Sequence, residues 1–342
     1  MRQRRICYTC SVPVGDTVFV DYAGRGELPR IAICGVSVAE RVVRKAAEAG
    51  AARVIVRAEA DQLPALPPLS VPVDVIPADA PVPEVPTVPG DVIAGVAITD
   101  ARTRRVATRA LLQSCRRSYD GLGDRYVIRG LSLRLSAVWC RLGITPNQIT
   151  IVNILVGLVA CVLPPLGTAA GFQLAGALMF VQVVLDSCDG EVARLRFLSS
   201  KFGMWLDNVS DDVIDIGFTI TLGIGIGGVW MWIAIIAAGL RSLCALMIHV
   251  DVARAGRPGD IMSFTWFFDT GGEDLADRFE TTRPSVMSLV RAAGRRDFYC
   301  LVWAATCVAG IPVVGLVLGV AVGAGYFGLA AAHVIVKRRR SR

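Results

Sequence analysis

The sequence predicts an all-α integral membrane domain with six transmembrane helices and an amphipathic juxtamembrane helix, preceded by a small α/β domain. Of the 342 residues, 54% are hydrophobic, more than an ordinary soluble chain carries. Residues 1–143 mix charge, proline and short apolar runs, whereas 148–336 is mostly long apolar blocks. We therefore expect three parts: an α/β domain at 1–100, connecting and juxtamembrane helices at 101–143, and a membrane domain at 144–337.

The N-terminal part alternates short apolar runs with one amphipathic stretch. Nine prolines between 64 and 89 predict mostly extended loop there. We expect these elements, in order: strand 31–35, helix 38–50, strand 52–58, a strand within 71–77, strand 90–100 and an Arg-rich helix at 101–117.

The membrane part begins with an interfacial helix at 125–142, where apolar residues alternate with four arginines. Each span needs about 20 apolar residues. The glycine-rich run 223–228 separates the third span from the fourth; the alternative is a single helix over 216–240, which would leave Asp207 to Asp215 outside the membrane. The fifth span is short, with Pro312 at its end. The expected spans are 147–165, 171–193, 203–223, 228–249, 297–310 and 312–336.

Positive charge is distributed unequally between the loops. The connections 166–170, 224–227 and 310–312 contain no Lys or Arg, whereas the other side carries basic residues and both termini. This asymmetry predicts a plasma (inner) membrane protein with both termini cytoplasmic. The net charge of +7 is explained by this anchoring, and no aromatic-interleaved basic patch indicates nucleic-acid binding.

Cysteine usage favours a reduced compartment. Five of the ten cysteines lie in or beside apolar segments, which is typical of packing cysteines and not of a disulfide framework. Cys7 and Cys10 form a lone CxxC, for which a zinc or redox role is the less favoured interpretation. The basic N-terminus lacks an uninterrupted apolar region, so we expect no signal peptide.

Four aspartates lie in the stretch DSCDGEVARLRFLSSKFGMWLDNVSD (186–211). On one helix, Asp186 and Asp189 share a stripe with Gly190 and Ala193. On the next, Gly203, Asp207 and Asp211 share another. A short connection at 195–202 makes the two helices antiparallel neighbours, so the four carboxylates converge at their cytoplasmic ends. Solvated helix ends are the alternative interpretation.

Converging carboxylates repel one another unless a cation neutralises them. An oxygen-only set suits Mg²⁺ or Mn²⁺, with Ca²⁺ as a further option. Two divalent ions would balance the four charges. The small residues beside them leave room for a ligand, so the pattern predicts a two-metal site for phosphate chemistry.

The same stretch resembles the signature of the CDP-alcohol phosphotransferase (phosphatidyltransferase) family at every fixed position from Asp186 to Asp211, and GITPNQIT (143–150) is similar to the start of that family's first span. The resemblance covers about 120–336. It implies a homodimeric membrane enzyme of phospholipid biosynthesis that moves a substituted phosphate from a CDP-alcohol, such as CDP-diacylglycerol or CDP-inositol, to a hydroxyl acceptor with release of CMP.

The resemblance also implies roles for particular residues. Asp186, Asp189 and Asp207 would be shared metal ligands. Asp211 would contact one metal and act as general base. The nucleotide-binding candidates are Gly190, Ala193, Arg194, Gly203, Asn147 and Thr150, with helix capping and packing the alternative for the last two.

The acceptor side is less distinctive. Arg241 lies inside an apolar segment, where contact with a phosphate or an aspartate competes with snorkelling. Arg254, Arg257 and Arg296 could bind an acceptor phosphate, although a surface charge is the favoured interpretation for each of them alone. Asp215 continues the second stripe and is expected to be structural or paired, with metal ligation the alternative.

The segment 27–56 resembles part of a sugar-phosphate nucleotidyltransferase domain, and 111–130 resembles the junction in inositol-phosphate cytidylyltransferase/di-inositol-phosphate phosphate synthase fusions. The domain here is shorter, and its glycine-rich loop is reduced to YAGRGELPR (22–30). We therefore expect an inactive relic. The fusion resemblance leaves two substrate hypotheses, a phosphatidyl-type transfer and a reaction of CDP-inositol with an inositol phosphate.

A cation transporter is a remote alternative from another class. Transporters place ion sites near the membrane midplane between inverted repeats. Here the acids lie at one end of the helices, and no second copy of the pattern is found.

Overall fold

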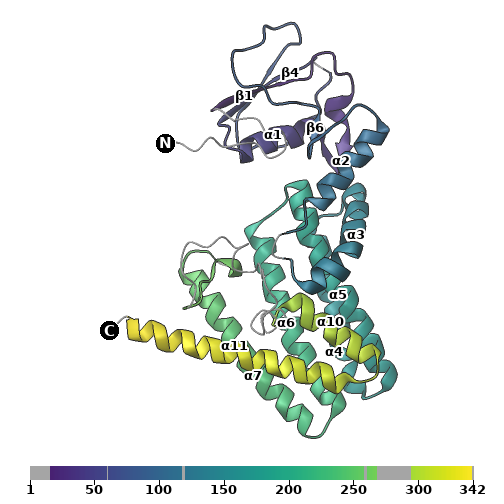
Figure 1. Ribbon diagram of the computed structural model, residues 1–342, viewed down its shortest axis with the longest axis vertical. Helices are drawn as coiled ribbons and strands as arrows, with labels where there is room; N and C mark the ends of the chain where they lie inside the picture. Colours follow the sequence, from purple (N-terminus) through teal and green to yellow (C-terminus); the bar gives the residue numbers. More distant parts are fainter. Residues whose placement is uncertain (1–15, 60, 118–119, 258–259, 268–293, 341–342) are drawn as a thin grey trace. The chain divides into compact units, whose positions relative to one another are not determined.

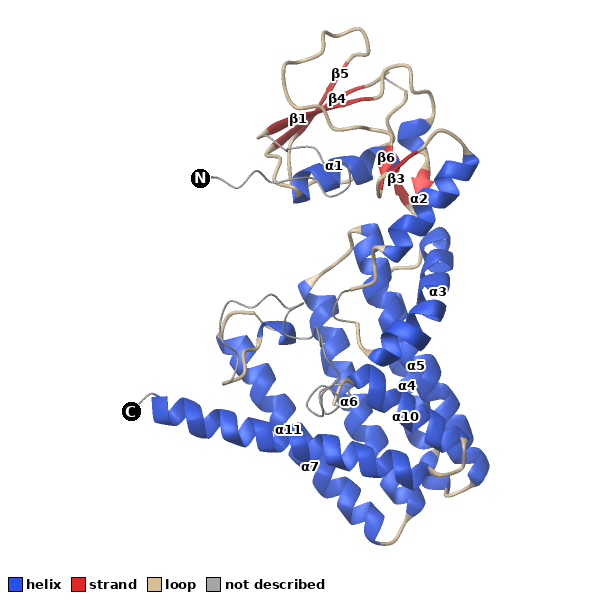
Figure 2. Ribbon diagram, in the orientation of Figure 1, coloured by secondary structure: helices blue, strands red, loops and turns tan. Residues whose placement is uncertain are grey.

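The computed structural model describes residues 16–59, 61–117, 120–257, 260–267 and 294–340. It divides into two units: Met1–Cys115 with Cys140–Gly143, and Arg116–Trp139 with Ile144–Arg342. The strands of the described chain lie in the first unit, and the second is helical (Figure 2). The CxxC of Cys7 and Cys10 lies outside the described residues.

The first unit is built on a parallel sheet with strand order β1 (Thr17–Asp21), β4 (Arg53–Arg57) and β5 (Val73–Ile76). Helix α1 (Val38–Glu48) packs against β4. Its N-terminus is capped by Ser37, whose side chain accepts a hydrogen bond from the backbone of Glu40. The predicted helix at 38–50 and the predicted strands at 52–58 and within 71–77 are confirmed.

Two of the predicted strands are instead short hairpins. The run 31–35 becomes β2 (Ala32–Ile33) and β3 (Val36–Ser37), and 90–100 becomes β6 (Val92–Ile93) and β7 (Val96–Ala97). Cys34–Gly35 and Ala94–Gly95 have positive φ at both residues, as a tight hairpin turn requires. The single-strand predictions are wrong because these turns reverse the chain after two residues. The unit also contains η1 (Leu28–Arg30) and α2 (Ala101–Gln113).

The second unit is a bundle of helices (Figure 1). Helix α4 (Pro146–Val162) packs against α5 (Ala169–Arg196) and α6 (Lys201–Ile226). Helix α5 packs against α10 (Arg296–Val308), α6 packs against α7 (Val229–Arg254), and α11 (Pro312–Arg340) packs against α7 and α10. The other elements of this part of the chain are η2 (Asp124–Ile128), η3 (Pro164–Leu166), η4 (Ile261–Ser263) and α3 (Arg129–Leu142), whose residues from Cys140 onward belong to the first unit.

Four of these helices are long and apolar enough to cross a membrane: α4 together with η3, α5, α7 and α11. The third predicted span, α6, carries several aspartates, and the fifth, α10, has only 13 residues. Four of the six predicted spans are therefore helices that could cross a membrane, and the count of six stays a prediction. The predicted break within 223–228 is confirmed, since Gly227 and Gly228 separate α6 from α7 at φ +80° and +58°.

The connection between α5 and α6 is what brings the predicted site together. Phe197 ends α5 in the left-handed conformation, and Ser200 caps α6 by accepting a hydrogen bond from Gly203 N at 2.9 Å. Only four residues separate the two helices. The last turns of α5 and the first turns of α6 therefore lie at the same end of the bundle.

Candidate active site

Three aspartates converge where α5 meets α6. Asp186, Asp207 and Asp211 each offer one carboxylate oxygen, and these oxygens all lie within 4.8 Å of one another. Asp207 and Asp211 are one turn apart on α6, so their side chains leave the same face. The two stripes read from the sequence are therefore brought together in space.

The three carboxylates fit a divalent cation. Within the described chain, the Oδ1 atoms of Asp186, Asp207 and Asp211 are buried and have no hydrogen-bond partner. Buried polar atoms without partners are rare and call for an explanation. Carboxylate oxygens are the ligands that Mg²⁺ and Mn²⁺ prefer, and a bound cation would satisfy all three.

Asp189 is held toward α4. It is 5% exposed, and the Thr150 hydroxyl donates a 2.7 Å hydrogen bond to its Oδ2. Asp189 is not one of the three aspartates that offer oxygens to the common cluster. Thr150, predicted on the nucleotide side, thus orients one of the predicted ligands.

The remaining nucleotide-side candidates lie on α4, α5 and α6. A Cβ atom on Gly203 would lie 3.1 Å from Asn147 Oδ1, so the absence of a side chain allows α6 to approach α4 closely. Asn147 itself is exposed, whereas Gly190, Ala193 and Arg194 on α5 are half-buried.

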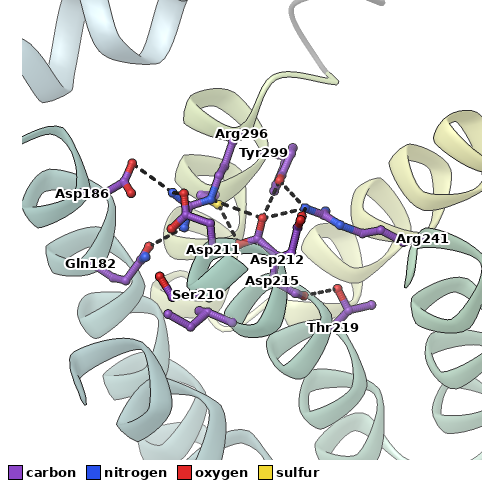
Figure 3. Close-up of polar contacts among 12 residues, drawn as sticks. Gln182, Asp186, Ser210, Asp211, Asp212, Asp215, Thr219, Arg241, Arg296 and Tyr299 are labelled. Atoms are coloured by element: carbon purple, nitrogen blue, oxygen red, sulfur yellow. Dashed lines mark hydrogen bonds and ion pairs between the residues drawn. The ribbon is translucent and has the colours of Figure 1, made fainter. Parts of the chain in front are cut away.

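Arg296 is the cation that contacts the cluster from α10 (Figure 3). Its Nη1 lies 2.9 Å from Asp186 Oδ2 and 2.8 Å from Asp211 Oδ2. Its Nε donates to Asp215 Oδ2 at 3.3 Å, and its Nη2 donates to Gln182 Oε1 at 3.2 Å. The favoured prediction for Arg296, a surface charge, is therefore wrong, because this side chain links α10 to α5 and α6 at the aspartates.

Asp215 is paired, as predicted. It is fully buried and accepts hydrogen bonds from Arg241 Nη2 at 2.7 Å and from the Tyr299 hydroxyl at 2.5 Å. Arg241 therefore contacts an aspartate and does not snorkel. Tyr299 was missed by the sequence analysis, since nothing in the pattern of α10 distinguishes it from a packing aromatic residue.

The other tentative acceptor residues lie apart. Arg254 ends α7 and Arg257 follows it, and both are exposed. Among the described residues, no ion pair or side-chain hydrogen bond joins either arginine to the aspartates.

The predicted interfacial helix α3 also contributes buried charge. Arg129, expected on its polar face, is 5% exposed and bonds Glu191 of α5 and Asp120. Although burial alone would raise it, the pKa of Asp120 is held below its usual value by Arg129. Burial and the nearby Asp297 raise the pKa of Asp124 to about 6.

Comparison with known proteins finds a family model that matches the segment with the aspartates. Residues 143–268 match the family model described as CDP-alcohol phosphatidyltransferase. This segment contains all four aspartates of the signature and Arg241, whereas Arg296 lies beyond it.

Several curated proteins are similar to part of the chain. The bifunctional IPC transferase and DIPP synthase of Thermococcus kodakarensis is 32% identical over 42% of this chain and 33% of its own length. The protein of that name from Aquifex aeolicus is 28% identical, over 45% and 36%. Archaetidylinositol phosphate synthase of Pyrococcus horikoshii is 38% identical over 29% of this chain and 50% of its own length. The chain thus matches about a third of the two bifunctional relatives and half of the third.

Proposed function

We propose that this chain transfers a substituted phosphate from a CDP-alcohol to a hydroxyl acceptor and releases CMP, because residues 143–268 match the model of the CDP-alcohol phosphatidyltransferase family. The observation that supports this most strongly is the group of three carboxylate oxygens within 4.8 Å of one another. The whole protein's substrates are part of the proposal, since the chain matches only a fraction of each relative's length.

We assign the metal to this cluster. Asp186, Asp207 and Asp211 would hold a divalent ion, with Asp189 completing a set suited to two Mg²⁺ or Mn²⁺ ions. A bound divalent ion would supply neutralisation of the pyrophosphate charge. Half-buried Gly190 and Ala193 leave space for the cytidine diphosphate beside Arg194, and Gly203, Asn147 and Thr150 line the opposing side.

Asp211 is the proposed general base. Its Oδ2 contacts Arg296 at 2.8 Å, while its Oδ1 is buried and has no partner within the described chain. The acceptor oxygen bonds to the transferred phosphorus as the bond to the CMP oxygen breaks, and the acceptor proton passes to Asp211.

An inositol phosphate is the acceptor class that we favour. The Pyrococcus relative, archaetidylinositol phosphate synthase, has this group in its name. A lipid-linked donor such as CDP-diacylglycerol is the first donor hypothesis. CDP-inositol is the second donor hypothesis, because the two bifunctional IPC transferase and DIPP synthases also match the chain. Arg241 and Arg296 lie nearest the aspartates as candidate phosphate contacts, whereas Arg254 and Arg257 are the exposed candidates.

We further propose a homodimer in the plasma membrane with the aspartates and both termini cytoplasmic. The helix ends nearest the aspartates carry Arg194, Arg196 and Lys201, whereas the turns at 167–168, 227–228 and 309–311 carry no charge. Labelling of single cysteines from either side of sealed vesicles tests the orientation. Cross-linking in the membrane tests the dimer.

A CMP-release assay tests the function. CDP-diacylglycerol and CDP-inositol are each supplied with inositol phosphate, glycerol phosphate or inositol. We expect CMP release that EDTA stops and that added Mg²⁺ or Mn²⁺ restores. Asp211→Asn should abolish release and largely spare donor binding, while Asp251→Asn, a carboxylate paired with Lys337, should behave as the wild type. Turnover unchanged in Asp211→Asn would refute the general-base role.

For the N-terminal unit we propose no nucleotidyl-transfer activity. In its loop YAGRGELPR, Arg25 forms a 3.0 Å ion pair with Asp91. The loop also lacks the glycine spacing that a triphosphate-binding loop uses. Purified protein should make no CDP-inositol from CTP and inositol phosphate. Robust synthesis would overturn this assignment.

A further inference from the structure

Glu191 lies within the aspartate stretch but points away from the aspartates. It has no exposed surface, and its carboxylate accepts three hydrogen bonds from α3. They come from Arg129 Nη1 at 2.6 Å, Ser132 Oγ at 2.7 Å and Ser136 Oγ at 2.7 Å. The three donors are spaced i, i+3 and i+7, so they form one stripe of α3.

This contact opposes movement of α3 relative to α5. A buried carboxylate is costly unless it is paired and hydrogen-bonded, and here both oxygens of Glu191 are engaged. Arg129 is in turn fixed by two hydrogen bonds to Asp120, at 2.8 and 2.9 Å. Rotating or sliding α3 along α5 would leave buried charges without partners.

The position of Glu191 on α5 connects this contact to the site. At 100° per residue, Glu191 is about 200° around the helix from Asp189 and about 140° from Asp186. The α3 contact on one face of α5 therefore determines the rotation of α5 about its axis. That rotation determines where Asp186 and Asp189 point.

The segment that precedes α3 also reaches α10. Asp124 N donates to Asp297 Oδ2 at 3.2 Å, and a side chain on Gly121 or Gly123 would collide with Asp297. Arg296, the neighbour of Asp297, contacts Asp186 and Asp211. Residues 120–136 therefore contact α5, which carries Asp186, and α10, which carries Arg296.

We propose that Glu191 is a positioning residue, which α3 holds through Arg129, Ser132 and Ser136 so that α5 presents Asp186 and Asp189 correctly to the cation and substrate. This inference rests on the proposed function. It adds a role for a residue that does not itself touch the cation or the CDP-alcohol, and for the helix that precedes the first span.

The test compares Glu191→Gln and the double variant Ser132→Ala/Ser136→Ala with Arg134→Gln, an exposed arginine on the same helix. Mn²⁺ binding is measured by calorimetry on detergent-purified full-length protein whose helical content is verified by circular dichroism. We expect about a 10-fold to 100-fold loss of Mn²⁺ affinity in the first two proteins and none in the control. At saturating Mn²⁺, the first two proteins should show a large decrease in kcat and a smaller change in the KM for the CDP-alcohol donor.

Two results would overturn the proposal. One is a lower unfolding temperature with wild-type Mn²⁺ affinity and wild-type kcat per folded molecule, which would make the contact merely structural. The other is equal weakening in Arg134→Gln. If Glu191→Gln does not fold, the serine double variant decides, because it keeps the ion pair. Because Mn²⁺ binding is measured without turnover, failure of the wild type to release CMP would remove the proposed function and leave the positioning result standing.

Discussion

Arg241 of α7 donates a 2.7 Å hydrogen bond from Nη2 to Asp215 Oδ2 of α6, a carboxylate with no exposed surface. The pair joins two helices one turn beyond Asp211. Arg241→Met should lower the free energy of unfolding by about 3 kcal/mol, because the buried Asp215 loses a charged partner. Thermal or denaturant unfolding in detergent measures this. The double variant Arg241→Met/Asp215→Asn should recover part of the loss, and a double variant less stable than the single one would contradict the pairing.

The hydrogen bond from Thr150 to Asp189 is expected to affect cation binding. Thr150→Val keeps the volume and removes the hydroxyl that holds Asp189 Oδ2 at 2.7 Å. Mn²⁺ affinity should fall roughly 10-fold, as for other groups that orient metal ligands. Thr221→Val on α6, whose hydroxyl bonds only a backbone carbonyl in the described chain, serves as the control. Equal affinities in the two variants would exclude this role for Thr150.

The close approach of Gly121 to α10 gives a packing prediction. An added Cβ would collide with the side chains of Asp297 and Arg295, so Gly121→Ala should displace the start of α10 and destabilise by about 1 to 3 kcal/mol. Gly130→Ala is the matched control, since nothing lies within 4 Å of its added Cβ. In helix α3 that change should be neutral or stabilising by up to about 1 kcal/mol. Comparing their unfolding midpoints separates steric collision from a general effect of alanine.

The pH dependence of stability should include a contribution from Asp124. Burial and Asp297 raise the folded-state pKa of Asp124 to about 6, so folding favours the protonated carboxyl. Its stabilising contribution is fully present below about pH 4 and is lost as the pH rises through about 6. Asp124→Asn should therefore flatten the stability profile across this window and raise stability at pH 7.5 by about 2 to 3 kcal/mol. A profile that keeps its slope would assign the dependence to other groups.

The sequence predicted the helical part of the fold well because its signals are local. Long apolar runs predicted the four helices that are long enough to cross a membrane, and the Gly227–Gly228 break followed from composition alone. The two hairpins of the first unit were missed, since an apolar run of four residues does not reveal a reversal at Cys34–Gly35. The capped turn at Ser200 has a recognisable residue type, and the α5–α6 connection was predicted correctly.

The site was predictable to the extent that it lies on one pair of helices. Asp186, Asp207 and Asp211 were read from spacing, because helical geometry alone places them on facing stripes. The partners of these aspartates that come from distant parts of the chain could not be predicted from spacing. Arg296 is 110 residues away from Asp186 by their sequence numbers, and Glu191 looks like a solvated acid until α3 is seen to cover it. Spacing reveals one helix face, but it does not reveal which helix packs on the other.

The short connection between α5 and α6 has a consequence for synthesis. Both helices that carry the aspartates emerge from the ribosome as one hairpin, whereas Arg296 is made 81 residues after Asp215. During this interval the nascent chain holds a cluster of acidic side chains in a nearly complete helical pair without the guanidinium that neutralises it. The ion pairs from Arg296 to Asp186 and Asp211 can therefore form only after α10 has been made.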